Sequence, residues 1–476
     1  MRKTASTGGR GAFRTRRLWL MVAAFAALNL LVLVIAAPGG HQEKDTGNYY
    51  AVARGLLQHG DFVNVDEPSK FVRIAPGYPL LLSVAHVVGR GDATIPIILI
   101  QVLALLVTGL ITRHVVSTWL GGFHNLAMAL VVFNPNSLGI AHTLMPMTLY
   151  ALALTASVWA GLEFARSPRM GHAVLAGLFL GLAVLFRFDP RFLIVLLPLA
   201  LPLLAISAGQ RMLSWRVLSG GFVAAALAAA TITPWTLYAD RSGPGFGVAG
   251  SATGELFLAA NLGILEKRLN PNLTPGFATI AAIERGIDDP VLHYREDETY
   301  EGFIGRSGVP QNFFEIVSSY PRTVVLKSLA FSHLNLFVSG GAGNIRRLFG
   351  IVGNESQDNY FWGGHGNRLS AWLGAFAANS PQSAAISVGA IVFATTMRLF
   401  GLFGLAALVT RRRWPLLIAI VTVLLYSTVI VIFNGLSRYR VPIEPLLIIL
   451  SVYGFDAIQS WRNRHRGLDG PKTSLH

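Results

Sequence analysis

The sequence predicts an all-α, polytopic membrane protein with about ten transmembrane helices. Its 476 residues are 53% hydrophobic and only 13% charged, whereas soluble domains carry about 25% charged residues. Charge-free apolar runs recur along the chain, many of them near the roughly 20 residues that a helix needs to cross a bilayer. The basic residues fall between alternate runs, as expected of loops on the cytoplasmic side. Most of the protein surface is therefore expected to face lipid.

The net charge of +15 and the absence of cysteine exclude several classes of function. In a soluble protein such a charge would suggest nucleic acid, but cytoplasmic loops of membrane proteins collect Lys and Arg. We therefore expect membrane lipids, and no nucleic acid, as partners. A chain without cysteine has no disulfide, thiolate metal site or cysteine nucleophile.

The first helix is expected at residues 18–37, a charge-free run of 20 residues after a basic tail at 1–17. A basic segment followed by an apolar run resembles a secretory signal. This run is long enough to span a bilayer, whereas the apolar part of a signal is shorter. We interpret it as a retained helix with its basic flank in the cytoplasm.

Further apolar runs complete the count, and the longest one, at 126–162, is split into two helices near residues 139–146 because Gly and Pro interrupt it there. The remaining runs are 94–112, 171–186, 192–208, 217–238, 384–410, 414–435 and 441–455. Ten crossings place both termini in the cytoplasm. The inner loops and tail then contain Arg113, Arg166, Arg169, Arg211, Arg216, Arg411, Arg412, Arg413, Arg462, Arg464 and Arg466, which agrees with the positive-inside rule.

Two segments are expected outside the membrane, on the periplasmic side. The first outer loop, 41–93, contains the apolar stretch 76–89, which is too short to span and is expected to lie in the interface. The larger outer loop, 239–383, contains an apolar stretch at 323–338 that polar residues interrupt, so we expect it on the surface. The predicted organisation is a tail at 1–17, a transmembrane module at 18–238, the outer region 239–383, closing helices at 384–458 and a basic tail at 459–476.

The candidate chemistry lies on the outer side, where polar residues are densest. Asp45, Tyr49 and Ala53 share one face of a helix at spacings of four. Asp45 is either a functional carboxylate or the N-cap of that helix. The residue pattern alone favours the cap, because acidic residues are common at helix starts.

Cations in three places form a candidate phosphate site. Lys70 and Arg73 precede the interfacial stretch, while Arg438 and Arg440 lie in a short outer turn, against the positive-inside bias. Arg398 falls inside a spanning run, where a charge normally faces a cavity. The alternatives are contacts with lipid headgroups or, for the outer turn, a pair with Glu444.

The order of these motifs resembles the bacterial GT-C glycosyltransferases, the group of protein O-mannosyltransferase-like enzymes, lipid A aminoarabinose transferases and rhizobial lipopolysaccharide glycosyltransferases. The resemblance spans residues 18–458. The motifs that carry it are Asp45-x-x-x-Tyr49-x-x-x-Ala53, Gly60-Asp61-Phe62, Arg73-x-x-Pro76-Gly77-Tyr78-Pro79, Gly177-x-x-x-Gly181 leading to Arg187, Thr233-Pro234-Trp235, and Arg438-Tyr439-Arg440-x-Pro442-x-x-Pro445.

This resemblance implies a GT-C fold with interfacial helices in the first outer loop, in the inner membrane. It implies an inverting transfer of a monosaccharide, hexosyl or pentosyl, from a polyprenyl-phosphate donor to an acceptor hydroxyl of an extracytoplasmic glycan, lipid or protein. Asp45 falls on the position commonly assigned as the base. Lys70, Arg73, Arg398, Arg438 and Arg440 would bind the donor phosphate, and Tyr49, Tyr78 and Tyr439 would contact the substrate. Arg and Lys can neutralise one phosphate, so neither metal nor cofactor is expected.

The chain departs from the family pattern at Lys44-Asp45, where two adjacent acids are common, and at Thr236 and Met145-Pro146-Met147. These departures leave the sugar and the acceptor open. Two other functions remain open as well. One is a secondary transporter, although repeated halves are not evident. The other is a ligase that moves a glycan from a polyprenyl-pyrophosphate carrier. The lack of a Walker-type loop argues against an ATP-driven pump.

Overall fold

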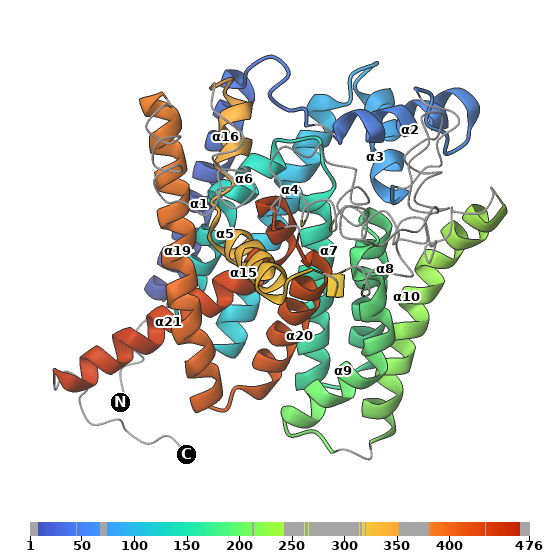
Figure 1. Ribbon diagram of the computed structural model, residues 1–476. Helices are drawn as coiled ribbons and strands as arrows, with labels where there is room; N and C mark the ends of the chain where they lie inside the picture. The colour runs from blue at the N-terminus through green and yellow to red at the C-terminus, as the bar shows by residue number, and fades with distance from the viewer. Residues whose placement is uncertain are drawn as a thin grey trace.

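The structure is a computed structural model, and every regular element in its described part is helical (Figure 1). It describes residues 8–43, 45–66, 74–211, 214–241, 261, 265, 314, 317–318, 320–351, 380–433 and 435–466. The longer helices are α1 (Gly8–Ile35), α4 (Thr94–Trp119), α7 (Met147–Arg166), α8 (Met170–Phe186), α9 (Leu193–Ser207), α10 (Trp215–Arg241), α15 (Arg322–Val338), α19 (Pro381–Thr410), α20 (Trp414–Val431) and α21 (Glu444–His465). The shorter ones are α2 (Thr46–His59), α3 (Gly77–Val88), α5 (His124–Val132), α6 (Pro135–Ala141), α16 (Ala342–Leu348) and the 3-10 turns η1 (Asp189–Phe192) and η3 (Ser437–Ile443).

Eight helical segments of the described chain are long and apolar enough to cross a membrane. The predicted all-helical, multi-pass architecture is therefore confirmed. The two other expected crossings are shorter, because α8 has 17 residues and α5 only 9. The split predicted near 139–146 is present, since α7 begins at Met147.

A second break, which the prediction missed, separates α5 from α6. The side chain of Asn134 accepts hydrogen bonds from the backbone N–H groups of Asn136 and Ser137 and so caps α6. Pro135 occupies the first turn of α6, where a missing N–H costs nothing. The Asn-Pro pair therefore starts a new helix where an uninterrupted crossing was expected.

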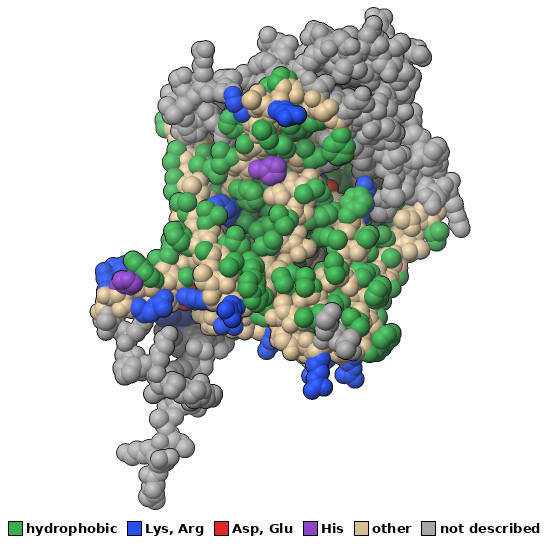
Figure 2. All heavy atoms as spheres, turned by 60° about the horizontal axis from the view of Figure 1, so that its bottom comes forward, with side chains coloured by type: hydrophobic (Ala, Val, Ile, Leu, Met, Phe, Trp, Pro, Cys, Tyr) green, Lys and Arg blue, Asp and Glu red, His purple; other side chains and the backbone are tan. Residues whose placement is uncertain are grey.

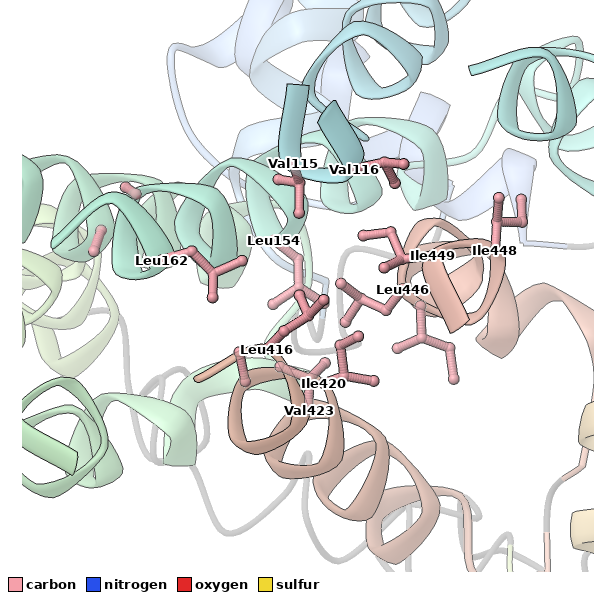
Figure 3. Close-up of a cluster of buried hydrophobic side chains, with 14 of the residues drawn as sticks. Val115, Val116, Leu154, Leu162, Leu416, Ile420, Val423, Leu446, Ile448 and Ile449 are labelled. Atoms are coloured by element: carbon pink, nitrogen blue, oxygen red, sulfur yellow. The ribbon is translucent and has the colours of Figure 1, made fainter. Parts of the chain in front are cut away.

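The core of the bundle is formed by α4, α7, α20 and α21 (Figure 3). Val116, Leu154, Ile420 and Ile449 point toward one another there, one from each helix, and each is at most 2% exposed. In the spanning windows of α7 and α21, 78% of the residues are buried inside the protein, against 17% for α1. The central helices α7 and α21 therefore hold the fold together, and α1 presents most of its surface to the surroundings.

Glycine allows two of the helix pairs to pack closely. A Cβ on Gly177 would lie 2.1 Å from the carbonyl oxygen of Ala224, so α8 meets α10 backbone to backbone. A Cβ on Gly404 would lie 1.9 Å from the carbonyl oxygen of Leu450, where α19 crosses α21. The small-residue pattern at Gly177 and Gly181 thus has a packing role.

The first outer loop forms α2 and α3, which pack together at one end of the bundle, at the top of Figure 1. Helix α2 ends at Gly60, whose φ of 70° favours glycine. Ser83 of α3 donates to the carbonyl oxygen of Ala53, and the rings of Tyr49 and Tyr78 meet edge to face at 5.2 Å. At 12 residues α3 is too short to span, as predicted.

Helix α15 covers the stretch 323–338 that we expected to lie on the surface, and it packs against the bundle through one face while most of its residues are exposed or half-buried. Its polar residues hydrogen-bond into the bundle, with Asn335 donating to the carbonyl oxygen of Gly435 at 2.8 Å and His333 contacting that of Thr428 at 3.1 Å. The side chains of Ser332 and Asn335 are buried. The polar residues that interrupt the apolar pattern therefore mark the face of α15 that donates to backbone carbonyl groups in α20 and just before η3.

Candidate active site

The start of α2 and the turn η3 meet at one guanidinium group. Arg438 Nη1 lies 2.8 Å from Glu43 Oε1 and 3.0 Å from Asp45 Oδ2. Glu43 and Asp45 follow the first helix, while Arg438 precedes the last one. The structure thus brings together the two outer segments that the sequence singled out.

Asp45 occupies the N-cap position of α2 but does not act as a cap. Its side chain makes no capping hydrogen bond, and its carboxylate pairs with Arg438 instead. The Asp45 side chain is 44% exposed, against 16% for Glu43. The capping alternative therefore fails, and Asp45 is the carboxylate of the pair that an incoming molecule can reach.

Two cations approach the ring of Tyr439. The guanidinium carbon of Arg187 lies 5.1 Å from the ring centroid, and that of Arg438 lies 5.5 Å from it. Arg187 ends α8 in an extended conformation and its Nε donates to Asp189 Oδ2 at 2.6 Å. Burial opposes the charge on Arg187, but Asp189 outweighs this effect and raises the Arg187 pKa. Both guanidinium groups therefore stay charged beside one aromatic ring.

The predicted tyrosines lie at different depths. Burial raises the pKa of Tyr49 to about 12, so its phenol is neutral, and the ring lies within the charge field of Arg187, Asp45 and Arg438. Tyr78 is fully buried, and its hydroxyl donates to Gln101 Oε1 at 3.0 Å. Tyr78 therefore supports Tyr49 by ring contact and has no surface for a substrate, which corrects its predicted binding role.

Arg398 and Arg440 form a separate buried cluster with Glu444. Arg398 Nη2 lies 2.8 Å from Glu444 Oε2, and Arg440 Nε donates to Glu444 Oε1. Arg440 is 1% exposed, and its Nη1 also donates to the carbonyl oxygen of Leu336. The alternative of a pair with Glu444 is therefore the one observed, which corrects the predicted role of Arg398 and Arg440 in a phosphate site. Lys70 and Arg73 lie outside the described residues.

Sequence reasoning missed several residues of this region. Glu43 and Arg347 join the network, since Arg347 Nη1 lies 3.9 Å from Glu43 Oε1. Arg187 and Asp189 had one signal in the sequence, a charged turn between two apolar runs. Arg347 had none, because it comes from α16 in the outer region. Within the described ranges, no three His, Asp or Glu side chains gather as metal ligands.

A polar cavity of about 20 Å³ lies beside Arg187, with walls that include Tyr150, Asp189, Tyr426 and Tyr439. This volume holds about one water molecule. An apolar crevice of about 70 Å³ lies between α7, α8, α9 and α20.

The two spaces are neighbours along three helices. The apolar crevice is lined by Leu154, Leu193 and Val423, each about one helical turn from a residue that lines the polar cavity, namely Tyr150, Asp189 and Tyr426. A charged end and an apolar end thus adjoin within one region of the bundle.

No family model matches the chain, and no curated protein matches it. Two solved structures are similar to it, both of ArnT from Cupriavidus metallidurans. The structure in the apo state is 15% identical, with 94% of this chain and 78% of that chain covered and a TM-score of 0.40. The structure bound to undecaprenyl phosphate is 15% identical, with 96% of this chain and 82% of that chain covered and a TM-score of 0.40.

Proposed function

We propose that the protein is an inverting glycosyltransferase that moves a monosaccharide from a polyprenyl-phosphate donor to an acceptor hydroxyl on the outer side of the membrane. The observation that carries the proposal is the exposed Asp45 carboxylate beside Arg438, with Arg187 and an apolar crevice close by. This arrangement supplies a base, cations and a lipid-binding surface. The motif order from Asp45 to Pro445 supports the same reaction.

Asp45 acts as the general base. The acceptor hydroxyl gives its proton to the Asp45 carboxylate while its oxygen forms a bond to the anomeric carbon of the donor. The bond from that carbon to the phosphate oxygen breaks on the opposite face, and its electron pair leaves with the phosphate. The products are the glycosylated acceptor, polyprenyl phosphate and a protonated Asp45. A positioned carboxylate contributes about 10²–10⁴-fold to such a step.

Arg438 and Arg187 bind the donor phosphate. Negative charge grows on the leaving oxygen, and fixed guanidinium groups stabilise it without reorganisation. In the structure, both guanidinium groups are paired with carboxylates. Arg438 pairs with Glu43 and Asp45, and Arg187 pairs with Asp189. The donor phosphate would compete with Asp45 for Arg438, which would free the carboxylate for the acceptor. Tyr49 and Tyr439 line this region, and Lys70 and Arg73 remain candidates for the same phosphate.

The crevice between α7, α8, α9 and α20, of about 70 Å³, receives the part of the isoprenoid chain next to the phosphate, and the rest of the chain lies in the surrounding lipid. Its lining is almost wholly apolar, with Leu180, Leu197, Leu201 and Ile418 among its walls. Because the polar cavity adjoins it, an amphiphile would place its phosphate near Arg187 and its tail against these leucines. The need to bind a lipid-linked donor explains why a sugar-transfer site would lie in a bundle of membrane helices.

The test is turnover of a panel of polyprenyl-phosphate monosaccharides by the purified protein in detergent, with released polyprenyl phosphate as the readout. The proposal expects turnover of at least one donor, and Asp45→Asn should abolish most of it. Turnover only of a pyrophosphate-linked glycan would identify a ligase instead. Donor-independent uptake of a solute into proteoliposomes, with no transfer, would identify a transporter.

A further inference from the structure

The opposite end of the bundle contains a basic cavity that the proposed reaction does not use. It measures about 380 Å³ and is lined by Trp119, Arg166, Ser207, Ala208, Arg412, Arg413 and Pro415. These residues come from the ends of α4, α7 and α9 and from the turn between α19 and α20. Figure 2 turns this end of the molecule toward the viewer, and Lys and Arg side chains lie along it. The volume is within the range of about 300–1,000 Å³ that is typical of ligand pockets.

The charge of this cavity is only partly compensated. Arg166 pairs with Glu163 at 3.1 Å, and the neighbouring Arg411 pairs with Asp456 at 3.1 Å. No carboxylate in the described part of the chain pairs with Arg412 or Arg413. Arg412 and Arg413 are exposed to solvent, so both guanidinium groups are open to an anion, and a hollow lined by one sign of charge attracts the opposite charge.

Two further features of the cavity lining support an anionic ligand. Arg412 has a φ of 54°, in the left-handed region that favours glycine at a helix C-terminus, so this turn keeps a guanidinium where glycine would be less strained. The indole Nε1 of Trp119 is buried and has no acceptor in the described structure. The cavity thus combines uncompensated cations with an unused hydrogen-bond donor, and both suit an anionic oxygen ligand.

The position of the cavity relative to the membrane surface indicates which anion it would bind. Trp414 begins α20 next to Arg413 and is 42% exposed, and Trp215 begins α10 and is 77% exposed. Exposed tryptophans at helix ends mark the membrane–water interface, where lipid headgroups lie. Basic pockets between transmembrane helices at this level bind anionic headgroups.

We propose that this cavity binds the phosphate headgroup of an anionic phospholipid from the leaflet opposite the candidate active site. Arg412 and Arg413 bind the phosphate oxygens, Trp119 donates a hydrogen bond, and the acyl chains pass outward along the bundle. The site does not depend on the proposed transfer reaction.

The experiment is native mass spectrometry of the delipidated full-length protein titrated with phosphatidylglycerol or with phosphatidylcholine. We expect one phosphatidylglycerol to bind more tightly than further copies and at least tenfold more tightly than phosphatidylcholine. The double variant Arg412→Gln/Arg413→Gln should weaken it at least tenfold, since each arginine near the surface contributes about fivefold. The matched control Arg211→Gln/Arg216→Gln removes the same charge from another loop of this end, where neither arginine lines the cavity, and should weaken binding clearly less than the Arg412→Gln/Arg413→Gln variant.

Four results would overturn the proposal. Equal losses in the two double variants would mean a diffuse basic surface, and equal affinity for phosphatidylcholine would mean no anion selectivity. Displacement by inorganic phosphate at the concentration of the lipid would mean a soluble anion site. Trp119→Phe keeps the charge and an aromatic ring, and removes the N–H donor together with part of the ring volume, so it tests the site even where an arginine variant does not fold. We expect it to weaken phosphatidylglycerol a few-fold, and unchanged binding would also contradict the assignment.

Discussion

Arg438 and Asp45 form an ion pair of 3.0 Å that joins the outer turn before the last helix to the start of α2. The same Arg438 nitrogen lies 2.8 Å from Glu43, so one cation is shared between two carboxylates. A ligand phosphate that reaches Arg438 would have to displace at least one of them. The exposed Asp45 is the partner with room to move, because the side chain of Glu43 is largely buried.

Replacing Asp45 with Asn should reduce turnover by about 10²–10⁴-fold, the contribution of a general base, while donor binding is kept or becomes tighter, because Asp45 no longer competes with the donor phosphate for Arg438. The amide keeps the shape of the side chain and removes its basicity. Turnover and donor affinity are measured separately in detergent. Asp66→Asn is the control, because Asp66 pairs with Arg54 on the exposed rim of the same loop. A large loss in Asp66→Asn with normal turnover in Asp45→Asn would move the base elsewhere.

Arg438→Lys should lower kcat/KM by about tenfold or more, because Lys retains the charge but loses the planar fork that binds carboxylate and phosphate. Arg347→Lys should have a milder effect, since Arg347 lies 3.9 Å from Glu43 and the structure shows no pair between Arg347 and Asp45. Steady-state kinetics over a range of donor concentrations separate KM from kcat. Equal losses in the two variants would argue that the network has only a structural role.

Glu444→Gln should destabilise the protein by about 3–5 kcal/mol, because it leaves two buried guanidinium groups without a carboxylate. Arg440 and Glu444 are 1% and 2% exposed at the side chain, so water cannot replace the lost charge. The fall in Tm in detergent measures the effect. Asp66→Asn breaks an exposed ion pair and should cost less than about 1 kcal/mol. A similar Tm for the two variants would show that the buried cluster of Arg398, Arg440 and Glu444 does not stabilise the fold more than an exposed ion pair does.

We expect the folded protein to lose stability in mild acid because of His142. Burial and the nearby His41 lower the pKa of His142 to about 4 from 6.5, and its Nε2 contacts Asn29 Oδ1 at 2.8 Å. The unfolded chain therefore binds more protons than the folded protein between pH 6.5 and 4, so the contribution of His142 is full above pH 6.5 and falls as the pH drops through this window. The Tm of the wild type should fall more between pH 7 and 5 than that of His142→Gln. Parallel falls would show that other groups control the acid response.

The sidedness of the protein can be tested with single cysteines, since the chain has none of its own. Gln42→Cys, in an exposed position before α2, should react with a membrane-impermeant thiol reagent in intact cells. Ser214→Cys, between α9 and α10, should react only after the membrane is permeabilised. The physical reason is the arginine-rich loop around Ser214, which the positive-inside rule assigns to the cytoplasm. The reverse labelling would invert the proposed topology.

Periodicity and length predicted the helices well, and failed where a local capping group overrode them. The apolar run at 126–162 contains Asn134-Pro135, and the Asn134 side chain satisfies two backbone N–H groups that would otherwise continue a helix. A hydropathy pattern does not detect a side chain that caps a helix. In α15, Lys327, His333 and Asn335 interrupt the apolar run; Lys327 is exposed, but His333 and Asn335 form hydrogen bonds with the bundle.

The candidate site was predicted in part. Asp45 and Arg438 were both singled out, and their meeting was expected because both segments are polar and lie on one side of the membrane. The sequence could not separate Arg438 from Arg440, which lie two residues apart in the same turn. The two side chains make different contacts because η3 directs Arg440 toward Glu444 and Arg438 toward Asp45. Arg187 and Arg347 come from other parts of the chain, and only the tertiary structure brings them in.

The buried cluster also constrains how the protein is made. Arg398 lies within α19, which emerges from the ribosome well before Glu444 at the start of α21. An unpaired arginine at the centre of a spanning helix opposes insertion by about 2.5–3.5 kcal/mol. During synthesis, α19 would therefore remain loosely held at the translocation machinery until its counter-charge arrives. Stable integration of the last three helices would then be a single late event, and a chain that stops short of Glu444 would keep the Arg398 charge without its carboxylate.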